Sequence, residues 1–222
     1  METTVGLPNM AEKILLFCGI LAALLYLGTD WLAGRALQGY SFAAQSMSEL
    51  SAAGSSTRSL VVSLNLVAGI LMIAFGVGVW RAAGPVLLPR VVAGLVIGNA
   101  AGGLIATLFF PNRFGERPVF ASAGVIIMLF SVLFLVLAMV IGAAAFGGWL
   151  RVLSIALPVA YILLAVLRFA TASTASSGGA VSLVGIQERT MSYGFLLWVM
   201  ALGIYLLLLA SKGMESASRI GG

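Results

Sequence analysis

Apolar residues in this chain form long runs that are separated by shorter polar connections. Six of these runs reach the roughly 20 residues that a helix needs to cross a bilayer core of about 30 Å. A backbone surrounded by lipid must satisfy its own hydrogen bonds, and the short alternating segments of a barrel do not occur, so helices are predicted. The predicted helices cover approximately residues 14–32, 60–80, 87–110, 119–146, 150–171 and 191–210.

Six crossings place both termini on one side of the membrane. The connections "RAAGPVLLPR" and "GGWLR" are short and share that side, whereas three longer polar connections share the opposite side. Six Lys and Arg residues fall on each side, so their count does not decide the orientation. The terminal-side cations stand at helix ends as anchors, while the opposite arginines lie near acids. We therefore expect cytoplasmic termini, a single domain over residues 1–212 and a C-terminal tail over residues 213–222.

Composition supports this picture. Of the 222 residues, 61% are hydrophobic and 9% are charged, whereas soluble domains carry about 25% charged residues. The expected fold class is therefore an all-α integral membrane bundle, in the inner (plasma) membrane of the cell. The net charge of +5 does not indicate nucleic-acid binding, because the basic residues form no run.

The residue inventory narrows the chemistry. The chain has no histidine, which is the commonest general base and a common haem and zinc ligand. Cys18 is the only cysteine and lies inside an apolar run. No nucleotide-binding or hydrolase motif occurs in a usable context. We expect no cofactor and no metal. The residue types and the missing motifs together favour a protein that is not an enzyme.

The connection "SMSELSAAGSSTR", residues 46–58, is unusually polar for this chain. Ser46 with Glu49 matches a capping box, and Gly54 to Thr57 matches a turn followed by a helix N-cap. Because the three long connections share one end of the bundle, their charged side chains are expected to converge there, where charges need partners. The candidate site consists of Asp30, Glu49, Arg58, Arg113, Glu116, Arg117, Arg168, Glu188 and Arg189.

Three interpretations of this cluster remain open. It forms a network of Arg–carboxylate pairs that clamps the connections over the helix ends, or its surplus of positive charge binds the phosphate of an anionic lipid headgroup. In the third interpretation, Glu49 or Glu188 acts as a general acid or base while arginines hold an anion.

Small and polar residues inside the helices predict close packing. Gly94, Gly98 and Gly102 form a doubled G-x-x-x-G face, which we assign to packing within the bundle rather than to dimerisation. Asn65 and Asn99 are expected to form hydrogen bonds between helices. Aromatic residues near the predicted helix ends, Tyr193 among them, match an interfacial belt.

Four stretches resemble a bacterial and archaeal membrane family catalogued as domain of unknown function 998. They are "SMSELSAAGSSTRSLVVSLNLVAGILM", "FFPNRFGE", "WLRVLSIA" and "GIQERTMSYGFLLWVMAL". The resemblance implies a six-helix integral membrane protein. A weaker likeness to membrane proteins of the Frag1/DRAM type implies lipid handling.

The chain departs from the family pattern at one point. Many members place a histidine early in the fourth helix, where this chain has Ala121-Ser122-Ala123-Gly124. This departure favours binding or assembly over catalysis. The function expected from the sequence is a non-enzymatic membrane protein that binds membrane lipids or serves as an accessory subunit of a larger membrane assembly. The alternative is a lipid-headgroup-modifying enzyme or a small-solute transporter that uses Glu49, Glu188, Arg58 and Arg189.

Overall fold

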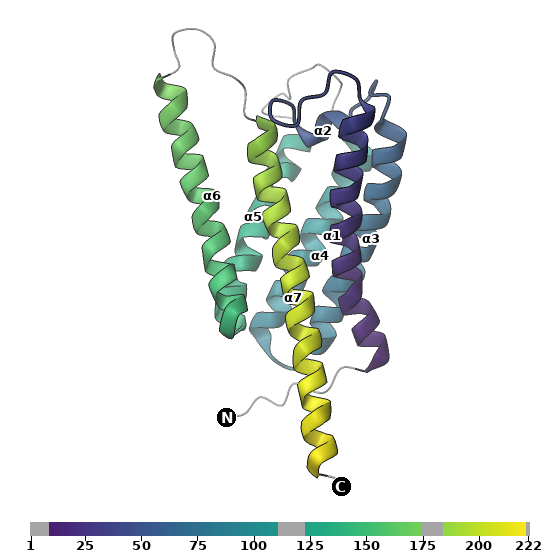
Figure 1. Cartoon of the computed structure of the whole chain (residues 1–222), viewed down its shortest axis with the longest axis vertical. Helices are drawn as coiled ribbons and strands as arrows, with labels where there is room; N and C mark the ends of the chain where they lie inside the picture. The colour runs from purple at the N-terminus through teal and green to yellow at the C-terminus, as the bar shows by residue number, and fades with distance from the viewer. Residues whose placement is uncertain (1–8, 111–122, 175–183, 221–222) are drawn as a thin grey trace.

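The computed structural model describes residues 9–110, 123–174 and 184–220 of the chain (Figure 1). Most of these residues are helical, and none of them belongs to a β-strand. The helices are α1 (Met10–Ala36), α2 (Met47–Leu50), α3 (Arg58–Ala82), α4 (Leu87–Phe109), α5 (Ala123–Ala145), α6 (Gly148–Thr174) and α7 (Val184–Ile220).

The length and composition of the helices are those of a membrane bundle. In the described part of the chain, five helices, α1, α3, α4, α6 and α7, are long and apolar enough to cross a bilayer. A shorter apolar stretch, Leu129–Ala145, belongs to α5. Large hydrophobic side chains remain exposed along these helices, such as Phe17, Ile70, Ile155 and Leu208, as expected of surfaces that face lipid rather than water.

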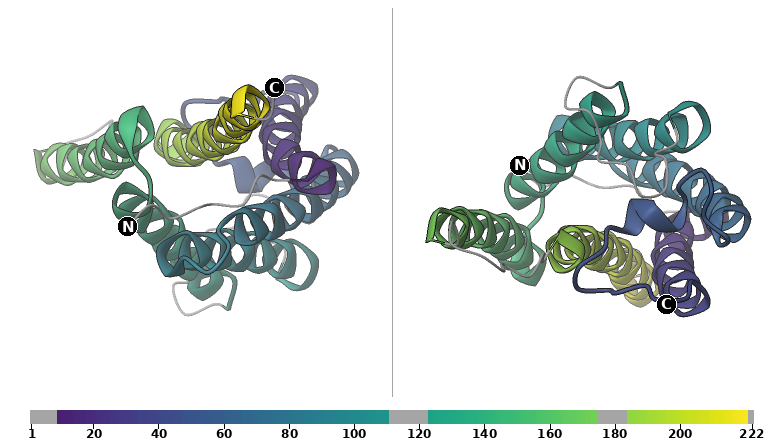
Figure 2. Two further views of the ribbon diagram at one scale, coloured as in Figure 1. Left: turned by 90° about the horizontal axis from the view of Figure 1, so that it is seen from below. Right: turned by 90° about the horizontal axis from the view of Figure 1, so that it is seen from above.

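The long helices run side by side, and each packs against its neighbours in chain order (Figure 1). The contacts lead from α1 to α3, α4, α5, α6 and α7, and α7 returns to α1, so the helices close a ring (Figure 2). Helix α1 begins and α7 ends at one end of the bundle, and α2 lies at the opposite end (Figure 1). The candidate site belongs to the α2 end.

Aromatic and aliphatic side chains fill the centre of the ring. Trp198 of α7 is fully buried, and its indole Nε1 donates a hydrogen bond of 2.8 Å to the hydroxyl of Ser154 on α6. A Cβ at Gly142 of α5 would lie 2.7 Å from the Trp198 ring, so the glycine makes room for it. Phe75 of α3 packs in the same way against Gly19 of α1.

Helix boundaries differ from those expected. Helix α1 begins at Met10 rather than near residue 14, because Asn9 and Glu12 form a capping box: Glu12 N donates to Asn9 Oδ1 at 2.9 Å, and Asn9 N donates to Glu12 Oε2 at 3.0 Å. Helix α7 runs from Val184 to Ile220, so it includes residues 184–190 before the expected start and most of the expected tail.

The glycine face of α4 is used inside the molecule. A Cβ at Gly98 would lie 2.6 Å from the ring of Phe134 on α5, and one at Gly102 would lie 3.4 Å from the hydroxyl oxygen of Ser131. Gly94 instead faces Trp80 of α3. Asn99 Nδ2 donates to the Ser131 carbonyl at 2.8 Å, which is the interhelical hydrogen bond predicted for it.

Candidate functional site

A buried ion pair joins the first and last helices at the α2 end of the bundle. Arg189 of α7 is 8% exposed and Asp30 of α1 is 3% exposed. Arg189 Nε donates to Asp30 Oδ2 and Arg189 Nη2 donates to Asp30 Oδ1, both at 2.9 Å. This two-pronged geometry matches the planar guanidinium to the carboxylate, so each buried charge has its counter-charge.

Arg189 also holds the segment between α1 and α3, residues 37–57, which we call the cap. Its Nη2 donates to the Tyr40 hydroxyl at 2.7 Å, and its Nη1 donates to the Phe42 carbonyl at 2.7 Å and to the Gln45 carbonyl at 3.2 Å. A longer Nη1 contact of 3.4 Å reaches the Gly185 carbonyl. A guanidinium has five N–H donors. All of them are therefore engaged by Asp30, the cap and α7.

Aromatic rings surround the same guanidinium. Its central carbon lies 4.8 Å from the centre of the Phe42 ring and 5.5 Å from that of Tyr40, within the range of cation–π attraction. Tyr193 of α7 donates a short hydrogen bond to Asp30 Oδ2. The carboxylate is thus bonded by both Arg189 and Tyr193.

Tyr40 extends the network into the cap. Its hydroxyl accepts from Arg189 and donates to the Ser46 carbonyl at 2.9 Å. Burial raises the pKa of the Tyr40 phenol above its usual value, although the neighbouring Arg189 acts in the opposite direction. The phenol therefore keeps its proton at neutral pH and remains a donor to Ser46.

Glu49 and Glu188 hold the start of α2. Glu49 Oε1 accepts from the Ser46 backbone N–H at 3.1 Å, as the capping box predicted, and its Oε2 accepts from the Gln45 side chain at 2.9 Å. Glu188 reaches across from α7, and its Oε2 accepts from the Met47 backbone N–H at 2.9 Å. Both carboxylates thus bond to backbone donors that no helix turn satisfies.

The backbones of the cap and of the start of α7 also contact each other directly. Ile186 N donates to the Ala43 carbonyl at 3.2 Å. A Cβ at Gly185 would lie 3.0 Å from that carbonyl oxygen and would clash with the carbonyl oxygens of Phe42 and Gln45. Only glycine therefore allows α7 to begin this close to the cap.

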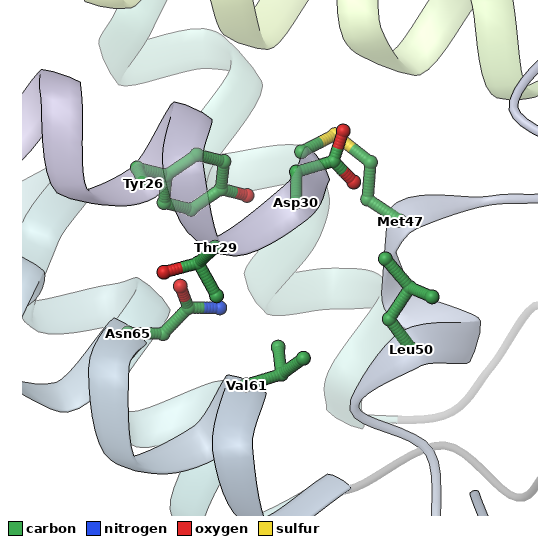
Figure 3. Close-up of a pocket in the computed structure, with 7 residues that line it drawn as sticks. All are labelled: Tyr26, Thr29, Asp30, Met47, Leu50, Val61 and Asn65. Carbon is green, nitrogen blue, oxygen red and sulfur yellow. The ribbon is translucent and has the colours of Figure 1, made fainter. Parts of the chain in front are cut away.

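A small cavity of about 20 Å³ lies beneath the cap, between α1, α2 and α3 (Figure 3). It is large enough for about one water molecule. The Oδ1 atom of Asn65 is buried and has no hydrogen-bond partner among the described residues. The donor role predicted for the Asn65 side chain concerns its amide nitrogen and stays a prediction. The lining residues are Tyr26, Thr29, Asp30, Met47, Leu50, Val61 and Asn65.

The structure brings together four residues of the predicted cluster: Asp30, Glu49, Glu188 and Arg189. Arg58 stands at the start of α3 and donates through Nη1 to the Ser51 carbonyl at 2.6 Å, so it fastens the other end of the cap. Arg113, Glu116 and Arg117 lie outside the described residues, as does the side chain of Arg168.

Three residues of the site were missed by the sequence analysis. Tyr40 and Phe42 lie in a connection without periodicity, and no signal in the sequence indicates their contact with Arg189. Tyr193 was assigned to an interfacial belt, although it follows Arg189 by four residues and so shares its helix face. That spacing could have placed Tyr193 beside the ion pair.

Comparison with known families now adds to the geometry. A family model described as "Protein of unknown function (DUF998)" matches residues 20–205. The chain belongs to the DUF998 family. The matched region of this DUF998 protein contains the ion pair, the cap and the cavity. No curated protein and no solved structure matches the chain.

Proposed function

We propose that this DUF998 protein is a non-enzymatic membrane protein that crosses the inner (plasma) membrane six times and keeps both termini in the cytoplasm. It acts by binding lipid, or a neighbouring subunit, through the membrane-facing sides of its helices. The polar end of the bundle is a clamp that fixes its shape. One observation carries this proposal: every N–H donor of Arg189 is already engaged inside the protein.

That observation favours a clamp over a catalytic or anion-binding site at Arg189. An arginine that recognises phosphate must offer donors to it, and Arg189 would first have to break its bonds to Asp30 or the cap. Glu49 and Glu188 likewise accept hydrogen bonds from the backbone at Ser46 and Met47. The cavity beside Asp30 admits only about one water molecule, so it has no room for a lipid headgroup.

The membrane-facing surface supports the binding part of the proposal. Among its described side chains, α6 turns a narrow stripe towards the bundle, formed by Leu150, Ser154, Pro158 and Tyr161. Large apolar side chains between these positions stay exposed, and α6 stands at the outer edge of the ring (Figure 2). Such a helix contacts lipid, or a neighbouring helix, over most of its circumference.

Native mass spectrometry after gentle extraction tests the proposal. We expect the protein to leave the membrane with phospholipid or with a second chain in fixed ratio. A lone monomer that retains neither would overturn both forms of the proposal. Retained phospholipid without a partner chain supports the lipid-binding form, and a stoichiometric partner supports the accessory-subunit form.

The enzyme or transporter alternative predicts a different result for the two glutamates. In our proposal, Glu49→Gln and Glu188→Gln each weaken the cap and lower the melting temperature, but the bound lipid or partner remains. In the alternative, the same substitutions abolish turnover or transport while the fold is unchanged. The melting curves and the native mass spectra of both variants therefore distinguish the two functions.

A further inference from the structure

We propose that the cavity beneath the cap is a specific site for one internal water molecule, which links Asn65 of α3 to the Asp30 carboxylate of α1. The proposal starts from Asn65, whose Oδ1 is buried without a partner. Buried polar atoms are nearly always hydrogen-bonded, to protein or to ordered water. Asn65 lines the cavity, and its amide oxygen lies on the side of Thr29 (Figure 3), so a small donor placed at that side of the cavity would satisfy it.

The size of the cavity selects the ligand. Its volume of about 20 Å³ exceeds the roughly 10–15 Å³ that one water molecule requires, but it is too small for a second one. A headgroup phosphate or a sugar would not fit. The ligand is therefore a single water molecule or an ion of similar size.

The lining supplies the two to four polar partners that an internal water needs. Tyr26, Thr29 and Asp30 face the cavity from α1, and the hydroxyl of Tyr26 points towards Asp30 (Figure 3). Asp30 accepts two bonds at Oδ2 and one at Oδ1, which leaves Oδ1 capacity for a further donor. One water can therefore donate to Asn65 Oδ1 and to Asp30 Oδ1.

Charge favours water over a cation. Arg189 already neutralises Asp30 with two hydrogen bonds of 2.9 Å. A cation in the cavity would add a second positive charge beside a carboxylate that Arg189 already neutralises, and the two like charges would repel at low dielectric. A neutral water adds a hydrogen bond without adding charge. It would extend the clamp from α1, α7 and the cap to α3.

Hydroxyl-radical footprinting by X-ray radiolysis tests this site, because radicals formed from a bound water oxidise side chains beside it. Met47 lines the cavity, whereas Met72 lies in the apolar core, and each is 7% exposed. Methionine is readily oxidised, so the two residues form a matched pair. We expect Met47 in the full-length protein to be labelled several-fold faster than Met72. Equal rates would overturn the proposal.

Two variants on α3 sharpen the test. Asn65→Leu removes the polar partner at nearly constant volume, and Met47 labelling should fall towards that of Met72. Ser63→Leu makes a similar change at an exposed position on the same helix and should leave the Met47 rate unchanged. Labelling that persists in Asn65→Leu would show that the radicals come from bulk water and would overturn the proposal.

Exchange of salts distinguishes water from an ion. The Met47 rate and the melting temperature should be the same in sodium chloride, potassium chloride and choline chloride. A Met47 rate that falls in sodium or potassium relative to choline, with a rise in melting temperature, would show that a cation occupies the cavity and would overturn the water assignment.

Discussion

A buried arginine is stable here because each of its donors has an acceptor. Desolvation of a guanidinium costs several kcal/mol unless both charge and hydrogen bonding are compensated. Asp30 supplies the charge, and the carbonyls of Phe42 and Gln45 supply acceptors that only a folded cap can place. The ion pair and the cap therefore stabilise each other.

Arg189→Ala should lower the free energy of unfolding by about 3–5 kcal/mol, because Asp30 is then buried without its counter-ion. Arg189→Lys keeps the charge but loses the planar fork, so it should recover only part of this loss. Thermal unfolding in detergent measures both variants. Arg35→Ala is the control, because Arg35 is exposed at the end of α1; an equal effect there would contradict the special role of Arg189.

Gly185 sets how closely α7 approaches the cap. Gly185→Ala would push a methyl group into the carbonyl oxygens of Phe42, Ala43 and Gln45, at a cost of about 1–3 kcal/mol. The cap should also become accessible to protease before the bundle unfolds. Gly28→Ala is the control: nothing lies within 4 Å of its added Cβ, so helix propensity predicts a gain of about 0.5–1 kcal/mol. Similar losses in both variants would contradict this contact.

At the scale of the helices, small residues decide which pairs come close. Gly98 of α4 receives the ring of Phe134, and Asn99 next to it bonds to the Ser131 carbonyl, so one turn of α4 supplies both the space and the hydrogen bond that hold α5. In lipid, such packing and polar contacts drive helix association, because the tails are as apolar as the side chains.

Gly98→Val should therefore separate α4 from α5. The added side chain meets the Phe134 ring, with a Cβ contact of 2.6 Å, so we expect a loss of about 1–3 kcal/mol. Gly103→Val is the matched control, since a Cβ at Gly103 has no neighbour within 4 Å. Unfolding monitored by the intrinsic fluorescence of the tryptophans distinguishes them. If Gly103→Val is the more damaging variant, the assignment of the packing face is wrong.

The sequence predicted those parts of the structure that depend on periodicity and composition. The apolar runs indicated the membrane helices, and the spacing of Gly94, Gly98 and Gly102 indicated close packing on α4. The Asn-x-x-Glu pattern at Asn9 also marks where α1 begins, but a criterion based on apolar residues alone overlooked it. The start of α1 therefore follows from a polar cap rather than from the apolar run.

The partners of the charged residues could not be predicted in the same way. The sequence led to the expectation that arginines and acids would pair with one another. Asp30 and Arg189 do so across 159 positions, but Arg58, Glu49 and Glu188 bond to backbone groups of the cap. The backbone groups of the cap reach these side chains only because the cap folds back over the helix ends. Its sequence has no periodicity from which that conformation could be predicted, and the conformation depends on the completed bundle.

At the scale of the whole molecule, the ring of helices gives the chain two chemically distinct ends. One end carries the cap and a neutralised ion pair. The opposite end, where α1 begins and α7 ends (Figure 1), carries Lys13, Arg81, Arg90 and Arg151 at helix ends. The Arg151 Nε donates to the carbonyls of Ala143 and Phe146 at the end of α5, at 3.0 and 3.2 Å. Because Lys and Arg beside membrane helices are enriched on the cytoplasmic side, we expect this end of the bundle to face the cytoplasm.

Cysteine labelling tests the orientation of the bundle and the crossing of the membrane by α1. In a Cys18→Ala background, Ser41→Cys places an exposed thiol on the cap, and Met10→Cys places one at the start of α1. A membrane-impermeant maleimide should label the cap thiol in intact cells and the Met10→Cys thiol only after permeabilisation. The reverse pattern would contradict the cytoplasmic termini. Labelling of both thiols from one side would mean that α1 does not cross the membrane, which would contradict the six-span bundle itself.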